Sequence, residues 1–226
     1  MFPCFFTKTI DNLIFARYNN KCYITNVIVE ELMAPRIKVT KEDIIATAIN
    51  LIRTNGDGCI NARAIASALN CSTQPIFSNF NSMEELEQEV IIGIYNIYTS
   101  FLKNEVENKK YPQYKAYGMA YIRFAKEERE LFKILFMRDR TNEENSVSMD
   151  FEESVQMIMK STGLSYEKAQ LMHFEMWTCV HGIATMIATS FFPLEWDVIS
   201  QITSDVYHGV VSRLLEGEKN NARNSN

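Results

Sequence analysis

The sequence has no long apolar run, no paired cysteines and no cluster of histidines, and each absence narrows the class of protein. No apolar stretch approaches the roughly 18 to 20 residues that span a bilayer, so we expect no membrane partner. The five cysteines are scattered without a CxxC pair, which argues against a disulfide framework or a zinc site. Free thiols of this kind fit a cytoplasmic protein.

Motifs of common catalytic sites are absent as well. The chain has no HExxH, no glycine-rich phosphate loop and no nucleophile elbow. His173 and His181 stand eight residues apart on one predicted helix, about 12 Å, which is too far for one metal ion. We therefore expect no catalytic residue, no metal site and no cofactor. A helical enzyme or carrier for a small apolar molecule is the alternative from another class.

Charge is distributed unevenly along the chain. The formal net charge of -5 gives no overall excess of positive charge that would indicate nucleic acid as a partner. However, residues 33–80 carry five basic and three acidic side chains, whereas residues 81–226 carry 15 basic and 22 acidic ones. A mildly basic segment therefore precedes an acidic body.

The first 32 residues differ from the rest of the sequence. They lack the basic start, the apolar stretch and the small-residue cleavage site of a signal peptide. The segment that follows opens with Met33 and a short basic arm, like the beginning of a protein. We hypothesise that Met33 is the physiological start and that residues 1–32 are an extension. The alternative is an additional, weakly structured element at the N-terminus.

Helical periodicity dominates from Thr40 onward, and strand patterns are few. Apolar residues recur three and four positions apart, as on the buried face of a surface helix. The pattern predicts an all-α fold of about nine helices. The first runs from Thr40 to a break at 55–58, and the others are expected at 61–69, from Ser72 to about 80, and at 82–106, 113–127, 130–138, 149–161, 165–190 and 196–215.

The second and third of these helices are short and are separated by a tight turn. Residues 61–80 read NARAIASALNCSTQPIFSNF, in which Asn61 can cap one helix and Ser72 the next. Pro75 then falls in a first turn, where backbone amides have no partner inside the helix and proline costs little. A second helix that opens on small polar residues is typical of the helix-turn-helix, which presents that helix to the DNA major groove.

Residues 71–86 read CSTQPIFSNFNSMEEL and resemble the helix-turn-helix of TetR-family transcriptional regulators. The likeness extends back through Arg63–Ala66 and the first predicted helix. Two positions depart from the family pattern. Phe77 replaces a tyrosine whose hydroxyl reaches a phosphate, and Met83 replaces a lysine that meets the DNA backbone. Both changes predict weaker phosphate contacts than is usual, and a shallow dependence of binding on salt.

The resemblance assigns roles to individual side chains on a double-stranded DNA operator. Gln74 is expected to read a base, because its amide can pair bidentately with adenine. The alternatives are that Gln74 is only solvated and that Phe77 only packs its helix. The complete set of expected DNA contacts is Lys38, Lys41, Asn61, Arg63, Ser72, Thr73, Gln74, Pro75 and Phe77.

The C-terminal part resembles the WHG-type body of the same family. Residues 121–125 and 130–136 resemble its fifth and sixth helices, and Trp177–Gly182 resembles its Trp-x-x-x-His-Gly signature. The resemblance implies a pocket for a small-molecule effector, apolar or aromatic, and a homodimer formed through 165–190 and the last helix. Pocket residues are expected to be Tyr121, Phe124, Phe136, Trp177 and His181, although aromatic residues at helical spacing more often belong to a plain core.

Together these patterns predict a helix-turn-helix DNA-binding domain at 33–82, a ligand-binding and dimerisation domain at 83–216, and a disordered tail at 217–226. The implied function is that of a repressor, without catalysis, that an effector releases from a palindromic operator. Because Phe77 and Met83 depart from the pattern, a degenerate regulator that binds a small molecule but little DNA is the second alternative.

Overall fold

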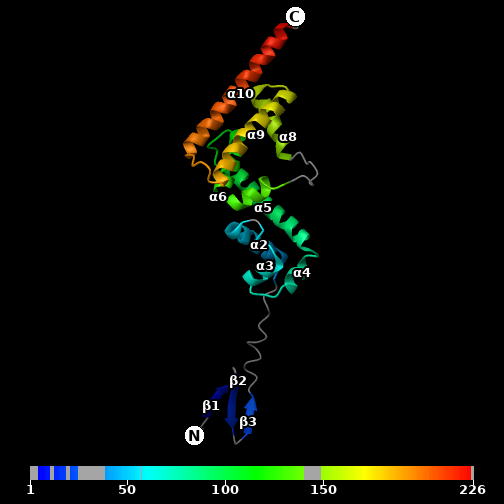
Figure 1. The fold of residues 1–226 in the computed structure, drawn as a ribbon, viewed down its shortest axis with the longest axis vertical. Coiled ribbons are helices and arrows are strands. Elements are labelled where there is room, and N and C mark those ends of the chain that lie inside the picture. The colour runs from blue at the N-terminus through cyan, green and yellow to red at the C-terminus, as the bar shows by residue number, and fades with distance from the viewer. Residues whose placement is uncertain are drawn as a thin grey trace. The chain divides into compact units, whose positions relative to one another are not determined.

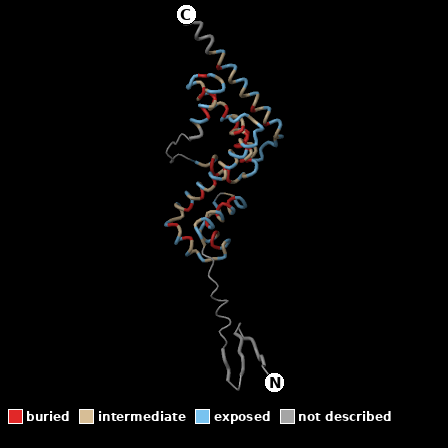
Figure 2. The backbone as a smooth tube through the Cα atoms, turned by 180° about the vertical axis from the view of Figure 1, so that it is seen from behind, coloured by how far each residue is buried: buried red, intermediate tan, exposed pale blue. Residues whose placement is uncertain are grey.

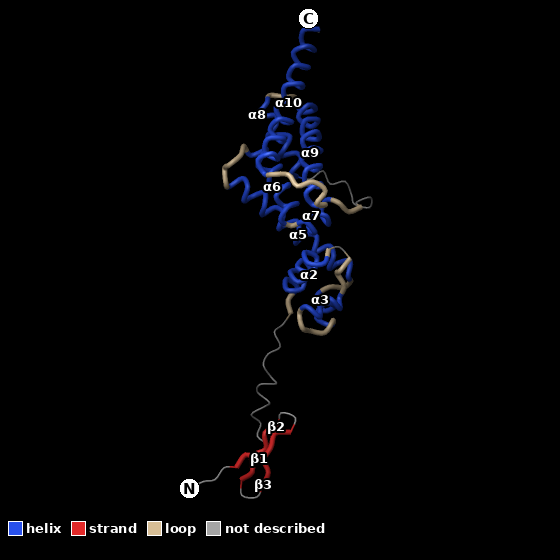
Figure 3. The backbone as a smooth tube through the Cα atoms, turned by 60° about the vertical axis from the view of Figure 1, so that its left-hand side comes forward, coloured by secondary structure: helices blue, strands red, loops and turns tan. Residues whose placement is uncertain are grey.

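The computed structural model describes residues 5–10, 13–18, 21–24, 39–56, 58–139 and 149–224, with the backbone alone at 5–24, 149–150 and 218–224. The chain divides into two compact units, Met1–Thr40 and Lys41–Asn226. Strands occur in the first unit and helices in the second, as the colours of Figure 3 show. No helix in these ranges has the length and apolarity needed to span a bilayer.

The first unit contains a small antiparallel sheet that the sequence analysis did not predict. Its strands are β1 (Phe5–Ile10), β2 (Leu13–Tyr18) and β3 (Lys21–Ile24), in the order β1-β2-β3. The register of β1 on β2 shifts between Phe6 and Thr9. Aromatic and β-branched residues, which favour strands, are frequent in all three segments, and Asn or Asp residues separate them.

The second unit confirms the predicted all-α fold. In the described residues its nine helices are α2 (Lys41–Asn55), α3 (Ala62–Ala68), α4 (Gln74–Asn79), α5 (Met83–Glu107), α6 (Gln113–Glu127), α7 (Arg129–Phe136), α8 (Met149–Thr162), α9 (Tyr166–Ala188) and α10 (Trp196–Asn224). Figure 1 shows their succession along this unit. The largest difference from the predicted bounds is in α10. It continues to Asn224 through the segment expected to be a disordered tail, which contains no proline to stop it.

Helix α2 packs against α3, α4 and α5, and we call α2, α3, α4 and the first turns of α5 the head. Each helix contributes a side chain that is almost completely buried, and these are Ile44, Ile65, Ile76 and Leu86. Burial of one such side chain stabilises the fold by about 1.5–3 kcal/mol. The head therefore has its own apolar core, whose buried positions appear in red in Figure 2.

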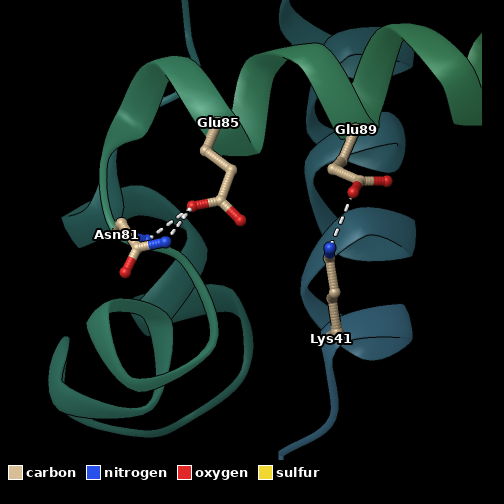
Figure 4. A network of polar contacts seen from close by, with 4 residues as sticks. All are labelled: Lys41, Asn81, Glu85 and Glu89. Carbon is tan, nitrogen blue, oxygen red and sulfur yellow. Dashed lines mark hydrogen bonds and ion pairs between the residues drawn. The ribbon is translucent and has the colours of Figure 1, made fainter.

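Polar contacts at the start of α5 fix the head to this helix (Figure 4). Ser82 caps α5 by accepting a hydrogen bond from the Glu85 amide at 3.2 Å. The Glu85 carboxylate in turn accepts from the backbone and side-chain nitrogens of Asn81, both at 2.8 Å. One turn further along, Glu89 pairs with Lys41 at the start of α2 at 2.7 Å. Two carboxylates on one face of α5 thus hold both α2 and the segment that leaves α4.

The remaining helices, together with the rest of α5, form what we call the body. Helix α9 is its central element and packs against α6, α8 and α10. Between α5, α6 and α7 lies an aromatic cluster with ring centroids 4.7–6.4 Å apart, formed by Tyr98, Tyr121, Phe124, Phe132 and Phe136. A second buried cluster joins α8, α9 and α10 and includes Val155, Ile158 and Met172. These two cores position the cavity described below.

Gly93 permits a close approach of α2 to α5. A Cβ atom at this position would lie 2.9 Å from Ile49 Cδ1 and 3.2 Å from Ile45 Cγ2, both on α2. We expect Gly93→Leu to lower the free energy of unfolding by about 1–3 kcal/mol, because it overpacks this contact. In Gly93→Ala, a gain in helix propensity of about 1 kcal/mol offsets a small movement of the isoleucine ends. Urea unfolding of both variants tests the contact, and equal stability of the two would contradict it.

Candidate nucleic-acid interface and ligand cavity

Hydrogen bonds define both ends of α3, including the turn that joins it to α4. Asn61 caps its start, since the Asn61 side-chain oxygen accepts from the Ala64 amide at 2.9 Å. At the other end the Cys71 amide donates to the Ala66 carbonyl at 3.0 Å, and the Asn70 amide donates to the Ser67 carbonyl at 3.2 Å. These two bonds form a Schellman motif, in which Asn70 takes the left-handed conformation at φ 50°. Asparagine tolerates that conformation better than most residues, so the sequence encodes the tight turn locally.

Helix α4 exposes polar residues at its N-terminus, and one face of the helix is buried against the head. Ile76 and Phe80 are buried beneath it. Ser72, Gln74 and Ser78 are exposed, as is Phe77, whose exposed fraction is 55%. The residue that precedes the helix is Thr73, which makes no capping hydrogen bond with its side chain, so the expectation that Ser72 caps this helix is wrong. Pro75 lies in the first turn, as expected.

The expected DNA contacts fall into three groups in the structure. Asn61, Arg63, Ser72, Gln74 and Phe77 are exposed on α3, α4 and the turn, and Thr73 and Pro75 are half-buried beside them. Lys41 lies at the start of α2, but its ammonium already pairs with Glu89 and lies 5.2 Å from the centroid of the Phe80 ring. Lys38 lies outside the described residues.

The body contains a cavity of about 1840 Å³. Helices α5 to α10 all contribute to its walls, which are mainly aromatic and aliphatic. Three of the five expected pocket residues line it, namely Tyr121, Phe136 and Trp177. Of these three residues Trp177 is the most exposed, with an exposed fraction of 48%.

The other two expected pocket residues lie behind the wall. Phe124 is completely buried in the aromatic cluster and does not reach the cavity. The ring of His181 stacks on Trp177 with centroids 4.9 Å apart and an interplanar angle of 8°. Its Nδ1 atom is hydrogen-bonded to the Tyr121 hydroxyl at 2.9 Å. His181 therefore supports two cavity residues without lining the cavity itself.

A second tyrosine–histidine pair repeats this arrangement along the same two helices. The Tyr114 hydroxyl is hydrogen-bonded to His173 Nδ1 at 3.1 Å, and both residues line the cavity. The sequence analysis did not assign either residue to the pocket. Tyr114 precedes Tyr121 by seven residues and His173 precedes His181 by eight, which is about two helical turns in each case. Helical spacing was therefore a signal that could have identified this pair.

Burial keeps both pairs uncharged near neutral pH. It raises the pKa of the Tyr114 and Tyr121 hydroxyls and lowers the pKa of His173 and His181. In the unfolded chain a histidine titrates near pH 6.5. Below that pH the unfolded state takes up protons that the folded state binds only at lower pH, so stability decreases on acidification.

We expect the thermal midpoint to fall between about pH 7 and about pH 5, and to fall less in the double variant His173→Gln/His181→Gln. In this pH range histidine protonation lowers stability, whereas protonation of the carboxylates does so only at lower pH. Glu84 and Glu85 have a lowered pKa because of hydrogen bonds to their carboxylates, so their contribution is lost only below about pH 4.5, the unfolded value. Differential scanning calorimetry over this range measures the effect. An equal slope in the wild type and the double variant would contradict neutral, buried histidines.

Comparison with known proteins agrees with this geometry. Residues 114–204 match the sequence model of the family described as tetracyclin repressor-like, C-terminal domain. The chain is 20% identical over 190 residues to the uncharacterized HTH-type transcriptional regulator YobS of Bacillus subtilis (strain 168), a match that covers 83% of this chain and 99% of YobS.

Two solved structures have a similar fold. A putative TetR-family transcriptional regulator from Vibrio parahaemolyticus superimposes with a TM-score of 0.54 at 17% identity, over 75% of this chain and 97% of the other. A TetR-like transcriptional regulator from Rhodococcus sp. RHA1 superimposes with a TM-score of 0.56 at 15% identity, over 81% and 98% of the two chains. The chain therefore shares the fold of these two proteins, and its residues 114–204 match a tetracyclin repressor-like C-terminal domain.

Proposed function

We propose that this protein is a sequence-specific DNA-binding transcriptional regulator, a repressor that a small-molecule effector releases from a palindromic operator in the cytoplasm. The observation that carries the proposal is the exposed polar N-terminus of α4, held in place by the buried Ile76 and Phe80. A helix presented in this way can enter the major groove and place its first residues against base edges. The protein acts by binding and not by catalysis.

Charge around α4 suits a DNA partner. Residues 58–83, which include α3, the turn and α4, contain no Asp or Glu, so no carboxylate of this segment repels a phosphate. Arg63 is exposed on α3 and makes no ion pair with any described residue, which leaves its guanidinium available to a phosphate. Gln74, exposed at the first position of α4, is the base-reading residue of this proposal.

A dimer follows from the surface that α9 and α10 leave uncovered. Leu171, Phe174 and Thr178 are exposed on α9. Further along, a Cβ atom at Gly182 of α9 or at Gly209 of α10 would meet no other atom within 4 Å. These helices therefore offer an apolar surface with room for the close approach of a helix from a second copy. A two-fold dimer would place two copies of α4 on half-sites about one DNA turn apart.

The effector can act on the head in two ways, through helix α5 and through an ion pair between α2 and Glu128, because each connects the head with the body. Helix α5 holds the head through Glu85 and Glu89 and lines the cavity further along, for example with Tyr98. Arg53 at the end of α2 forms a bidentate pair with Glu128, with both N···O distances 2.8 Å, next to the start of α7. A ligand that moves α5 or α7 therefore changes the orientation of α4.

DNA binding is tested by substitutions that leave the core intact. We expect Gln74→Ala to weaken binding to the operator by about 1–3 kcal/mol and to relax sequence preference at one base pair. Arg63→Ala should weaken all duplexes alike and reduce the slope of log K against log salt by about one unit. Gln156→Ala on α8, also an exposed glutamine, is the control. Fluorescence anisotropy with labelled duplexes measures each effect.

One outcome of the same titration favours a different function. If the wild-type protein binds no duplex at low salt while still binding small molecules, it is a degenerate regulator. Two observations point in that direction. Phe77 offers no hydroxyl to a phosphate, and the ammonium of Lys41 is held by Glu89.

The route between cavity and head is tested at Glu128. We expect Glu128→Gln to change the free energy of unfolding by about 1 kcal/mol or less, because Arg53 is partly exposed. The change in operator affinity caused by the effector should shrink, since α2 is no longer tied to the α6–α7 corner. Glu127→Gln is the matched control, because Glu127 pairs with Arg123 within α6. Equal effector responses in both variants would rule out the Arg53–Glu128 route.

A further inference from the structure

We propose that the cavity binds an amphipathic organic anion, such as a carboxylate with an apolar body, and that Lys115 and the Ser204 hydroxyl receive the anionic group. The inference rests on the proposed effector site and assigns its ligand a chemical class. It depends on the charge of the cavity wall and on the contacts of one lysine.

The cavity wall carries positive and no negative side chains. None of the residues that line it, as far as the structure describes them, is Asp or Glu. Lys115, Arg138 and Lys160 all line it. In the whole chain acidic residues outnumber basic ones by 28 to 23, so a wall without a carboxylate departs from the general composition. An anion inside the cavity meets no like charge, whereas a cation meets three.

Lys115 is half-buried on α6, and its contacts are all with uncharged groups. Its Nζ atom donates to Ser204 Oγ at 2.7 Å, to Ser200 Oγ at 2.8 Å and to the Ser200 carbonyl at 2.9 Å. It also lies 4.9 Å from the centroid of the Tyr111 ring. No carboxylate of the described residues lies within 4.0 Å of this ammonium.

This makes Lys115 different from the cations that tie other parts of the fold together. Lys41, Arg53 and Arg123 each pair with a glutamate, at 2.7, 2.8 and 2.9 Å. Neutral acceptors position the Lys115 ammonium without neutralising it, so its field extends into the cavity. The Ser204 hydroxyl, which accepts from Lys115, keeps its own hydrogen to donate. The three N–H bonds of the ammonium are all engaged by these acceptors, so a carboxylate here accepts from the Ser204 hydroxyl beside the Lys115 charge, or replaces one serine oxygen as the acceptor of Lys115.

The rest of the cavity suits an apolar body. Tyr121 follows Lys115 by six residues on α6, about 9 Å along the helix axis. Near Tyr121 the wall also includes Phe136 and Trp177. Tyr114 and His173, which line the cavity as well, are hydrogen-bonded to each other and neutral, so they add no charge to it.

The test compares three ligands that share a ten-carbon chain, which are decanoate, decanol and decyltrimethylammonium. Isothermal titration calorimetry of the full chain without DNA gives their affinities. We expect decanoate to bind about tenfold or more tightly than decanol, which is the size of a charge-assisted hydrogen bond, and the cation to bind most weakly. Equal or tighter binding of the cation, or no detectable binding of decanoate, would overturn the proposal.

Substitutions assign the preference to Lys115. Lys115→Met should remove the advantage of decanoate over decanol while leaving decanol affinity unchanged, which also shows that the cavity is intact. Lys126→Met is the matched control, since Lys126 is exposed on the same helix and lies over the Trp196 ring away from the cavity. If Lys115→Met fails to fold, Ser204→Ala should weaken decanoate several-fold and spare decanol. A preference for decanoate that survives both changes contradicts the assignment.

The result that would refute the proposed function differs from the result that would refute the anion site. Decanoate that binds with the expected preference but does not change operator affinity refutes its role as an effector and leaves the anion site standing. Conversely, an operator complex that forms normally while decanoate and decanol bind equally refutes the anion site and leaves DNA binding standing.

Discussion

The anchoring of the head on α5 is the constraint on which the rest of the structure depends. Glu85 and Glu89 stand one turn apart and hold Asn81 and Lys41, so the segment that leaves α4 and the start of α2 are tied to the same face of α5. Beyond them Gly93 removes the side chain that would keep α2 away. A short helix of six residues has little stability of its own, and α4 keeps its position because these contacts and the buried Ile76 and Phe80 fix it.

Helix α5 also connects the head to the cavity in the body. Helix α5 enters the aromatic cluster through Tyr98 and lines the cavity from Gln88 to Leu102, so one helix both holds the head and lines the cavity. The bidentate pair of Arg53 and Glu128 adds a second connection between the parts. Coupling of about 1–3 kcal/mol between two sites is enough for regulation.

The sequence predicted the helices well, although not the N-terminal sheet, because local signals define the helices. Asn61 before α3, Asn70 in the turn and Pro75 at the start of α4 each act within a few residues of their own position. The depth of a side chain was harder to predict. The resemblance to a WHG-type body placed Phe124 and His181 in the pocket, but it could not tell a residue in the wall from one behind it. Lys115 was missed because its acceptors, Ser200 and Ser204, come from α10, and no local pattern links them.

The central claim is that a dimer presents two copies of α4, each held by its own α5, to one DNA duplex. Selection of bound duplexes from a pool of random DNA tests this claim most directly. The account predicts enrichment of an inverted repeat whose half-sites are about 10–10.5 base pairs apart, centre to centre, or a multiple of that distance. A pool that stays random after repeated rounds, or enrichment of an unpaired single half-site, would contradict it.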